Sequence, residues 1–317
     1  MKRLLFSPLV LFFLASTALA HGGGEEEGPR DFHDLASDWG REPGSVLFLV
    51  LLALLYGRGL LRMRGISPRL VRRSDVAFFT AGWIVLFIAL ASPLHSWGEV
   101  LFSAHMVQHE LLMLVAAPLL VLGRPLPAFL HALPSGWASG AVRLFNGSGW
   151  HRLGRWVLHP FSAWLIHAVV LWVWHAPFLF QAATENDGIH FLQHASFLGS
   201  ALLFWWAVIH GRQRALGFGA AVLYMFGTAI HSGLLGALLT FSDSPWYPVY
   251  DETTAPWGLT PLQDQQLGGL IMWIPAGLVY VAAGLLLLVG WMRESERRVR
   301  RSESETTAPP CASPKEG

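Results

Sequence analysis

Seven apolar stretches dominate this chain of 317 residues. A helix needs about 20 apolar residues to cross the hydrocarbon core of a bilayer, because each residue adds only about 1.5 Å to its length. Hydrophobic residues make up 53% of the chain and charged residues 14%, whereas soluble domains carry about 25% charged residues. The stretches are 44–61, 76–94, 101–122, 159–180, 190–210, 216–241 and 267–290. The sequence therefore predicts an all-α, polytopic membrane protein, with residues 44–291 forming one seven-helix transmembrane bundle.

The distribution of arginines predicts the orientation of this bundle. Arginines lie in the loops after the first, third and fifth stretches and directly after the seventh. The intervening loops, 95–100, 181–189 and 242–265, contain neither Lys nor Arg. Because Lys and Arg are enriched in cytoplasmic loops, we expect the N-terminus to lie outside and the C-terminus in the cytoplasm.

The two ends of the chain are predicted to lie outside the bundle. Residues 1–20 have the basic start, the apolar core and the Ala-x-Ala cleavage pattern of a secretory signal peptide, with an uncleaved anchor as the alternative. Residues 21–43, rich in Gly and Glu, are expected to form a flexible extracytoplasmic N-terminus. Residues 292–317 are charged and then rich in Ser, Thr and Pro, which predicts a disordered cytoplasmic tail.

The outer loop 242–265 is predicted to be ordered. It contains Trp246, Tyr247, Tyr250 and Trp257. Aromatic side chains of this kind favour the membrane–water interface, so we expect the loop to form a structured cap on the outer side of the bundle.

Several function classes are excluded or disfavoured by the sequence. Cys311 is the only cysteine, which excludes disulfides within the chain, CxxC pairs and cysteine-based metal sites. The net charge of +1, without a dense basic block, gives no sign of a nucleic-acid partner. His109-Glu110 begins like the HExxH motif of zinc proteases, but Met113 replaces the second histidine. No Ser-His-Asp set or Gly-rich phosphate loop is recognisable, so we expect a protein that is not an enzyme.

The segment from His105 to Met113 carries the strongest chemical signal. At 100° per residue, His105, Met106, His109 and Met113 fall within about 100° of one another on the helical wheel. Imidazole and thioether groups are ligands for soft and borderline metal ions. Ionisable side chains inside a membrane usually face the bundle interior and mark functional sites. The pattern therefore predicts a metal site on the third helix.

Other histidines are predicted to lie at a similar depth in the outer half of the bundle. His190 and His194 form a second pair one helical turn apart, and a single histidine lies on each of two further helices, His175 and His231. His95 is the weakest candidate because it lies at the membrane boundary. A lone membrane histidine more often forms an interhelical hydrogen bond than ligates a metal. That simpler interpretation is kept for His159, His167 and His210.

Three polar residues near these histidines are predicted to orient them. Metal-ligating imidazoles usually donate their second N–H to a carboxylate, an amide or a carbonyl group. Gln108 and Glu110 flank the first histidine pair, and Asp264 begins the seventh stretch on the same side. The alternative for Glu110 is a neutral carboxylic acid that bonds a backbone carbonyl. For Met106 and Met113 the alternative is ordinary core packing, which is the commoner role of methionine.

Four sequence blocks resemble the caa3-type cytochrome c oxidase assembly factors, the seven-span CtaG family of Gram-positive bacteria. They are HMVQHELLMLVAAPLLVLGRP at 105–125, WVWHAPFLFQAA at 172–183, HFLQHASFLGSALLFWWAV at 190–208 and DQQLGGLIMWIPAGLVY at 264–280. The blocks follow the order of the family and span most of residues 80–290. The resemblance implies a multi-pass protein of the bacterial plasma membrane that is needed to produce active haem–copper oxidase, with cytochrome c oxidase subunits as partners. It also suggests a role in copper handling.

The residues and the resemblance leave three hypotheses. The first is a membrane assembly factor that binds or delivers copper at an outward-facing His/Met cluster. The second is a haem-binding membrane cytochrome or haem-handling protein, in which facing histidines such as His109 and His194 ligate haem. The third is a copper transporter, which requires ligands staged across the whole membrane. Membrane lipid is the other partner expected in each case.

Overall fold

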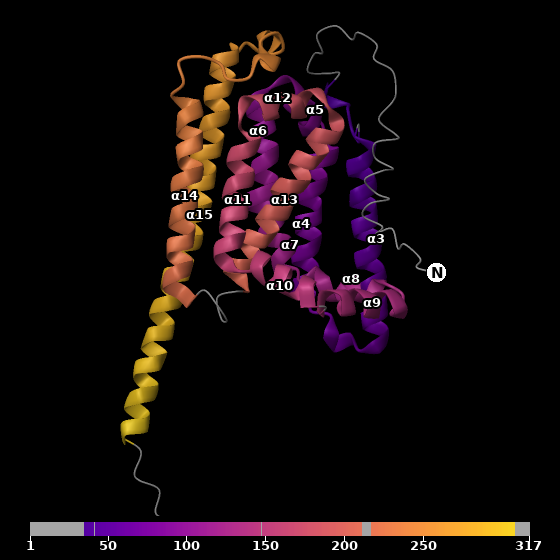
Figure 1. Ribbon diagram of the computed structural model, residues 1–317, viewed down its shortest axis with the longest axis vertical. Coiled ribbons are helices and arrows are strands. Elements are labelled where there is room, and N and C mark those ends of the chain that lie inside the picture. Colours follow the sequence, from indigo (N-terminus) through magenta and orange to yellow (C-terminus); the bar gives the residue numbers. More distant parts are fainter. Residues whose placement is uncertain (1–34, 41, 147, 211–216, 308–317) are drawn as a thin grey trace, which may run out of the picture.

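The structure is a computed structural model that describes residues 35–40, 42–146, 148–210 and 217–307. The predicted signal peptide and most of the predicted flexible N-terminus lie outside these residues. The described part is helical, and its longest helices run side by side as a bundle (Figure 1). Helices that are long and apolar enough to span a membrane are α3 (Pro43–Ile66), α4 (Arg73–Ala91), the run Phe102–Leu122, α13 (Asp187–Ile209), α14 (Gly217–Thr240) and α15 (Pro261–Thr307). The prediction of an all-helical, multi-pass membrane protein is thereby confirmed.

The predicted fourth span is a bent pair of helices instead of one straight helix. α11 (Pro160–Trp174) and α12 (Pro177–Glu185) meet at an angle of 75°. A residue that precedes proline is disfavoured in the helical conformation, and Ala176, before Pro177, is extended with φ −63° and ψ 128°. The described chain therefore has six spans, or seven if the bent pair is counted as one. The bend leaves His175 at the end of α11.

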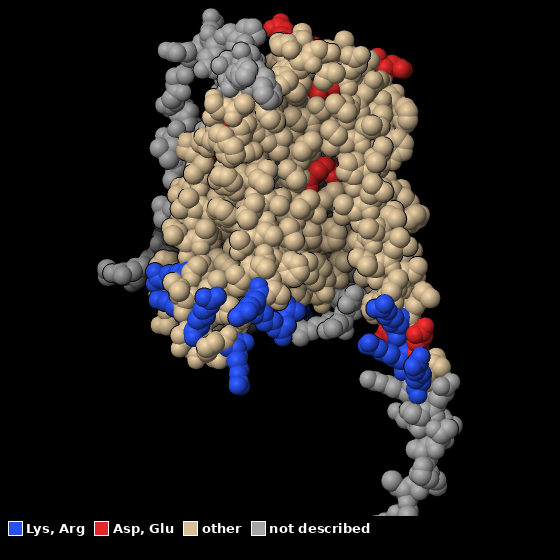
Figure 2. Space-filling model, turned by 180° about the vertical axis from the view of Figure 1, so that it is seen from behind, with Lys and Arg blue, Asp and Glu red and all other residues tan. Residues whose placement is uncertain are grey.

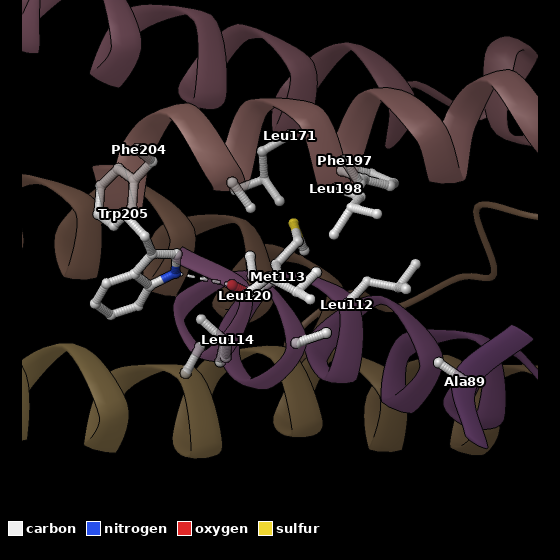
Figure 3. Packing of buried hydrophobic residues seen from close by; sticks show 14 of the residues in the cluster. Ala89, Leu112, Met113, Leu114, Leu120, Leu171, Phe197, Leu198, Phe204 and Trp205 are labelled. Atoms are coloured by element: carbon white, nitrogen blue, oxygen red, sulfur yellow. Dashed lines mark hydrogen bonds between the residues drawn. The ribbon is translucent and has the colours of Figure 1, made fainter. Parts of the chain in front are cut away.

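The third span changes its helical geometry directly after the paired histidines. α6 (Phe102–Glu110) is followed by a π-helical turn, η2 (Leu111–Ala116), and then by α7 (Ala117–Leu122). The next π-type bond would need an N–H from Pro118 to reach Met113, and proline has none. The indole of Trp205 donates to the Met113 carbonyl instead, with an N···O distance of 2.9 Å (Figure 3). Since α13 carries Trp205, this bond holds α13 against the turn below the histidines.

α14 and α15 form a closely packed hairpin at one side of the bundle (Figure 1). Their backbones approach at Gly236 and Gly269. A Cβ atom placed on Gly236 would lie 2.8 Å from the Gly269 carbonyl oxygen. The start of α15 also packs against α6, which brings the seventh predicted stretch beside the first histidine pair.

The short helices lie at the other end of the bundle from α5 (Leu94–Val100) and α12 (Figure 1). They are α8 (Pro125–Ala132), α9 (Ser135–Asn146) and α10 (Ser148–Val157). Arg62 of α3 donates to the carbonyls of His131 and Leu133 at 3.0 and 2.9 Å, and so caps the C-terminus of α8. The Lys and Arg side chains seen in Figure 2 also gather at this end, below a broad face that is almost free of basic residues.

The last helix extends further than the predicted tail allows. α15 continues to Thr307, whereas the sequence predicted disorder from residue 292. This stretch alternates acidic and basic residues, and Arg298 pairs with Glu294 one turn away at 3.3 Å. Pairs at this spacing stabilise an exposed helix, which hydropathy alone does not reveal.

Candidate metal centre

Five histidines from three helices meet inside the bundle near the end that carries α5 and α12. α5 contributes one, α6 two and α13 two. The imidazole rings of His105 and His109 are 4.3 Å apart between centroids, and those of His190 and His194 are 4.2 Å apart. The two pairs also face each other, with 5.2 Å between the centroids of His105 and His190. The sequence predicted the two i,i+4 pairs at a similar depth, and the structure brings them face to face.

The five side chains form two overlapping groups that have the spacing of metal ligands. Within each group, the nitrogen atoms that could bind an ion lie within 4.8 Å of one another. We call His95, His190 and His194 the rim group, and His105, His109 and His194 the core group. His194 belongs to both groups.

The nitrogens of the core group are free to bind an ion. His109 and His194 have no hydrogen-bond partner for either ring nitrogen among the described residues. The Nδ1 atom of His105 lies 3.4 Å from the Gly98 carbonyl oxygen, which can only accept, so Nδ1 carries the proton. The Nε2 atom of His105 therefore presents its lone pair. Buried polar atoms are rarely left without a partner, and these face one another in a geometry that a soft or borderline metal ion would satisfy.

His95 is held differently from the other four histidines. The side-chain amide nitrogen of Gln108 lies 2.7 Å from the Ala89 carbonyl and 3.1 Å from Nδ1 of His95. Because the amide donates both bonds, Nδ1 of His95 accepts and its Nε2 carries the proton, 3.9 Å from a carboxylate oxygen of Glu99. Burial lowers the pKa of His95 and outweighs the opposing effect of the Asp187 carboxylate. The ring is therefore neutral at pH 7, as a metal ligand must be.

His175 lies at the edge of this cluster. Its ring centroid is 6.1 Å from that of His109. Its Nδ1 donates to the Leu171 carbonyl at 2.7 Å, and its Nε2 has no partner within the described part of the chain. This is the arrangement of a ligating imidazole, but His175 belongs to neither of the two groups.

His231 does not join the five histidines. It lies on α14 with its ring 5.5 Å from that of Trp164, on the side of the bundle formed by α11 and α14. The similar depth that the sequence predicted for His231 therefore did not place its ring on the same face of the bundle as the five histidines. His167, for which hydrogen bonding was expected, does form a bond of 3.1 Å with the Ser200 hydroxyl.

Both methionines of the predicted stripe pack in the hydrophobic core. Met106 is fully buried and lies beside Gly268 of α15. Figure 3 shows the Met113 side chain directed toward Leu171, Phe197 and Leu198. The two methionines thus fill the packing role that was the alternative to metal binding.

The three predicted supporting residues have three different environments. Gln108 contacts His95, as described above. Asp264 accepts hydrogen bonds from the backbone N–H groups of Phe102 and Ser103, at 2.6 and 3.2 Å, and so caps the N-terminus of α6. No hydrogen bond joins Asp264 to a histidine among the described residues. Glu110 is half-buried near the π-helical turn, and one of its carboxyl oxygens has no partner in the described chain.

The predicted outer loop closes over the histidines. Tyr250 donates to the Gly98 carbonyl and Tyr247 to the His175 carbonyl, both at 2.9 Å. Burial raises the pKa of Tyr250, so its hydroxyl remains a donor at neutral pH. The ring of Tyr247 stacks on that of Phe102, with 4.9 Å between centroids. The expectation of an ordered aromatic cap agrees with these contacts.

Two further residues at the site were not singled out from the sequence. Gly98 lets α5 approach α6, since a Cβ atom there would lie 3.3 Å from the Cα of His105. Gln193 is fully buried between the two histidines of α13. Its amide lies close to His105 but forms no hydrogen bond of normal geometry. A polar residue directly before His194, within an otherwise apolar stretch, was the available signal for Gln193.

Comparisons with known proteins identify relatives of this chain. Uncharacterised proteins of Mycobacterium bovis and Mycobacterium tuberculosis are each 28% identical to it over 262 residues. A Mycobacterium leprae protein is 24% identical over 260 residues. Each alignment covers 80% of this chain but only 39% of the relative. No solved structure matches. The family described as "Cytochrome c oxidase caa3 assembly factor" matches residues 54–294, and the chain therefore belongs to the caa3-type cytochrome c oxidase assembly factor family.

Proposed function

We propose that this protein binds copper at the histidine cluster and delivers it to a subunit of a haem–copper cytochrome c oxidase. The observation that carries the proposal is the core group, in which three neutral imidazoles direct unpartnered nitrogens at one another. Imidazole is a good ligand for copper, and the family is described as assembling a cytochrome c oxidase, which we take to be a haem–copper enzyme. The protein acts in this role as a carrier rather than an enzyme.

We further propose that the cluster faces the outside of the plasma membrane. The short helices α8, α9 and α10 lie at the opposite end of the bundle from α5 and α12 (Figure 1), and the basic side chains gather at that same end (Figure 2). By the positive-inside rule, that basic end is cytoplasmic. The histidines then open toward the compartment from which copper arrives, and the C-terminal helix extends into the cytoplasm.

The packing around the histidines argues against haem as the ligand. Phe197 lies with its ring 4.5 Å from that of His109, and the Phe180 ring is 5.1 Å from that of His105. His109 and His194, the pair predicted for axial ligation, are 5.3 Å apart between centroids. A porphyrin could enter this space only if α6 and α13 separated. A transporter is disfavoured because His167 is engaged with Ser200 and no second group of metal-ligand spacing lies toward the basic end within the described residues.

Elemental analysis of the detergent-purified full chain, together with a visible spectrum, tests the proposal. We expect copper to bind, no Soret band to appear, and copper to be lost in the double variant His105→Ala/His109→Ala. His231→Ala is the matched control, since it removes an intramembrane imidazole that lies apart from both groups. Stoichiometric copper in the double variant would remove the proposed site, and a Soret band with no copper would replace it with the haem hypothesis.

A further inference from the structure

The two histidine groups differ in their access to the surface. In the rim group, His95 is 5% exposed and His190 is 8% exposed, whereas His105 and His109 of the core group are each 1% exposed. The imidazole of His109 is enclosed by Phe197 and by other imidazoles. An ion that reaches the core group from the α5 end therefore passes the rim group.

Acidic side chains surround the rim group and would attract a cation to it. A carboxylate oxygen of Glu99 lies 3.9 Å from Nε2 of the neutral His95, and the Glu99 side chain is 37% exposed. Asp38 accepts a hydrogen bond of 2.7 Å from Ser96, the residue next to His95. Asp187 begins α13 one turn before His190. Carboxylates near a site raise the local concentration of cations and speed their capture.

His194 can serve only one of the two groups at a time. A neutral imidazole has one N–H and one lone pair, so it binds a single ion unless it loses a second proton. The core group has a free lone pair on His105 and unpartnered nitrogens on His109 and His194. In the rim group, the Nδ1 of His95 is occupied by Gln108 and becomes a ligand only when that hydrogen bond opens. The core group is therefore the better resting position.

From these observations we propose that the rim and core groups are successive positions of a single copper ion, which reaches the core group through the rim group and exchanges between them on the shared His194. This proposal rests on the proposed function, because it takes copper as the ion. It adds a path and a stoichiometry of one. Transfer requires only ligand exchange: His194 keeps its bond to the ion while two imidazoles of one group replace two of the other, so no electron is transferred.

The test uses the purified full chain in detergent and Cu(I) supplied anaerobically as its bicinchoninate complex. The colour of the complex reports the loading rate, and excess chelator added afterwards reports the release rate. Elemental analysis after desalting gives the ions per chain. For the unaltered protein we expect one copper ion per chain.

Substitutions at three histidines separate the two positions. We expect His95→Ala to slow loading by about tenfold or more while one copper ion is still held. His109→Ala is expected to load at a near-normal rate and to release copper about tenfold faster or more. His194→Ala, with His194→Asn as a second variant of more similar polarity, is expected to abolish retention. The size-exclusion profile of each variant verifies that it is folded, and His231→Ala is the control that should match the unaltered chain.

The outcomes distinguish this proposal from the proposed function. Two copper ions per chain, or equal effects of His95→Ala and His109→Ala on loading and on release, would overturn the sequential path and leave copper binding intact. Copper retained by both folded His194 variants would also overturn it. An unaltered protein that takes up no copper would overturn both the path and the proposed function.

Discussion

The carboxylate of Asp264 should stabilise the folded state by several kcal/mol, because it accepts hydrogen bonds from N–H groups at the start of the helix that carries His105 and His109. It is fully buried and accepts three hydrogen bonds, from the backbone N–H groups of Phe102 and Ser103 and from the Ser103 hydroxyl. The first N–H groups of a helix have no partner within the helix. Asp264→Ala leaves two of them buried without an acceptor, at about 1–3 kcal/mol each, so the expected loss is about 2–6 kcal/mol.

Asp264→Asn is the matched variant, since its side-chain oxygen can still accept from one N–H while its NH₂ group faces the other. We expect it to lose about half as much stability as Asp264→Ala. Unfolding with denaturant in mixed micelles, followed by tryptophan fluorescence, measures both losses. Hydrogen exchange of the peptide 101–110 should accelerate in Asp264→Ala, because the His105 N–H donates to Leu101 within this first turn. If both variants kept full stability and both lost copper equally, Asp264 would act on the imidazoles and the capping argument would be refuted.

Three further substitutions test other parts of the structure. Gly236→Ala should destabilise the α14–α15 hairpin by about 1–3 kcal/mol, because its Cβ would lie 2.8 Å from a carbonyl oxygen. Gly277→Ala is the control, since there is open space around Gly277 and no loss of stability is expected. Equal unfolding free energies for the two variants would contradict this argument. Burial raises the pKa of Glu42 from 4.5 to about 6. Ionisation of Glu42 therefore destabilises the folded state as the pH rises from about 4.5 through 6. At pH 7.5, Glu42→Gln should be up to about 2 kcal/mol more stable than the unaltered chain, whereas at pH 4 the two should be equally stable. Denaturation at both pH values measures this difference. Trp205→Phe should cost about 1–3 kcal/mol, since it leaves the Met113 carbonyl unpaired; unchanged stability in the same assay would show that another donor reaches that carbonyl.

The sequence predicted the spans and the two histidine pairs because both depend on residues that are close together in the sequence. Hydropathy over about 20 residues identifies a span, and an i,i+4 spacing places two side chains on one face whatever surrounds the helix. His231 marks the limit of this reasoning. Its depth was predicted from its position along α14, but the direction in which α14 presents it depends on how that helix packs against α11 and α15.

The remaining differences arise from contacts that are remote in the sequence or from local backbone geometry. Asp264 caps a helix that begins 162 residues earlier, and no local pattern connects the two. Met113 lies beyond the point at which the helix becomes π-helical, so the 100° rule no longer applies to it. His95 was ranked last because it lies at the membrane boundary, yet the short helix α5 folds it back against His190, with 5.2 Å between their ring centroids.

The chemistry of the core group bears on the oxidation state of the copper ion that we propose it binds. Its three donors are neutral imidazoles, and they are surrounded by aromatic rings, other histidines and the amide of Gln193. The free energy needed to transfer an ion from water to a buried site rises with the square of its charge. For a divalent ion without a carboxylate ligand, this desolvation free energy is therefore about four times that of a monovalent ion. The carboxylate of Glu99 lies beside His95, on the rim side of the shared His194. We therefore predict that the core group, if it binds copper as proposed, prefers Cu(I) to Cu(II) or Zn²⁺, and that divalent cations bind more readily at the rim group, where acidic side chains offset their charge.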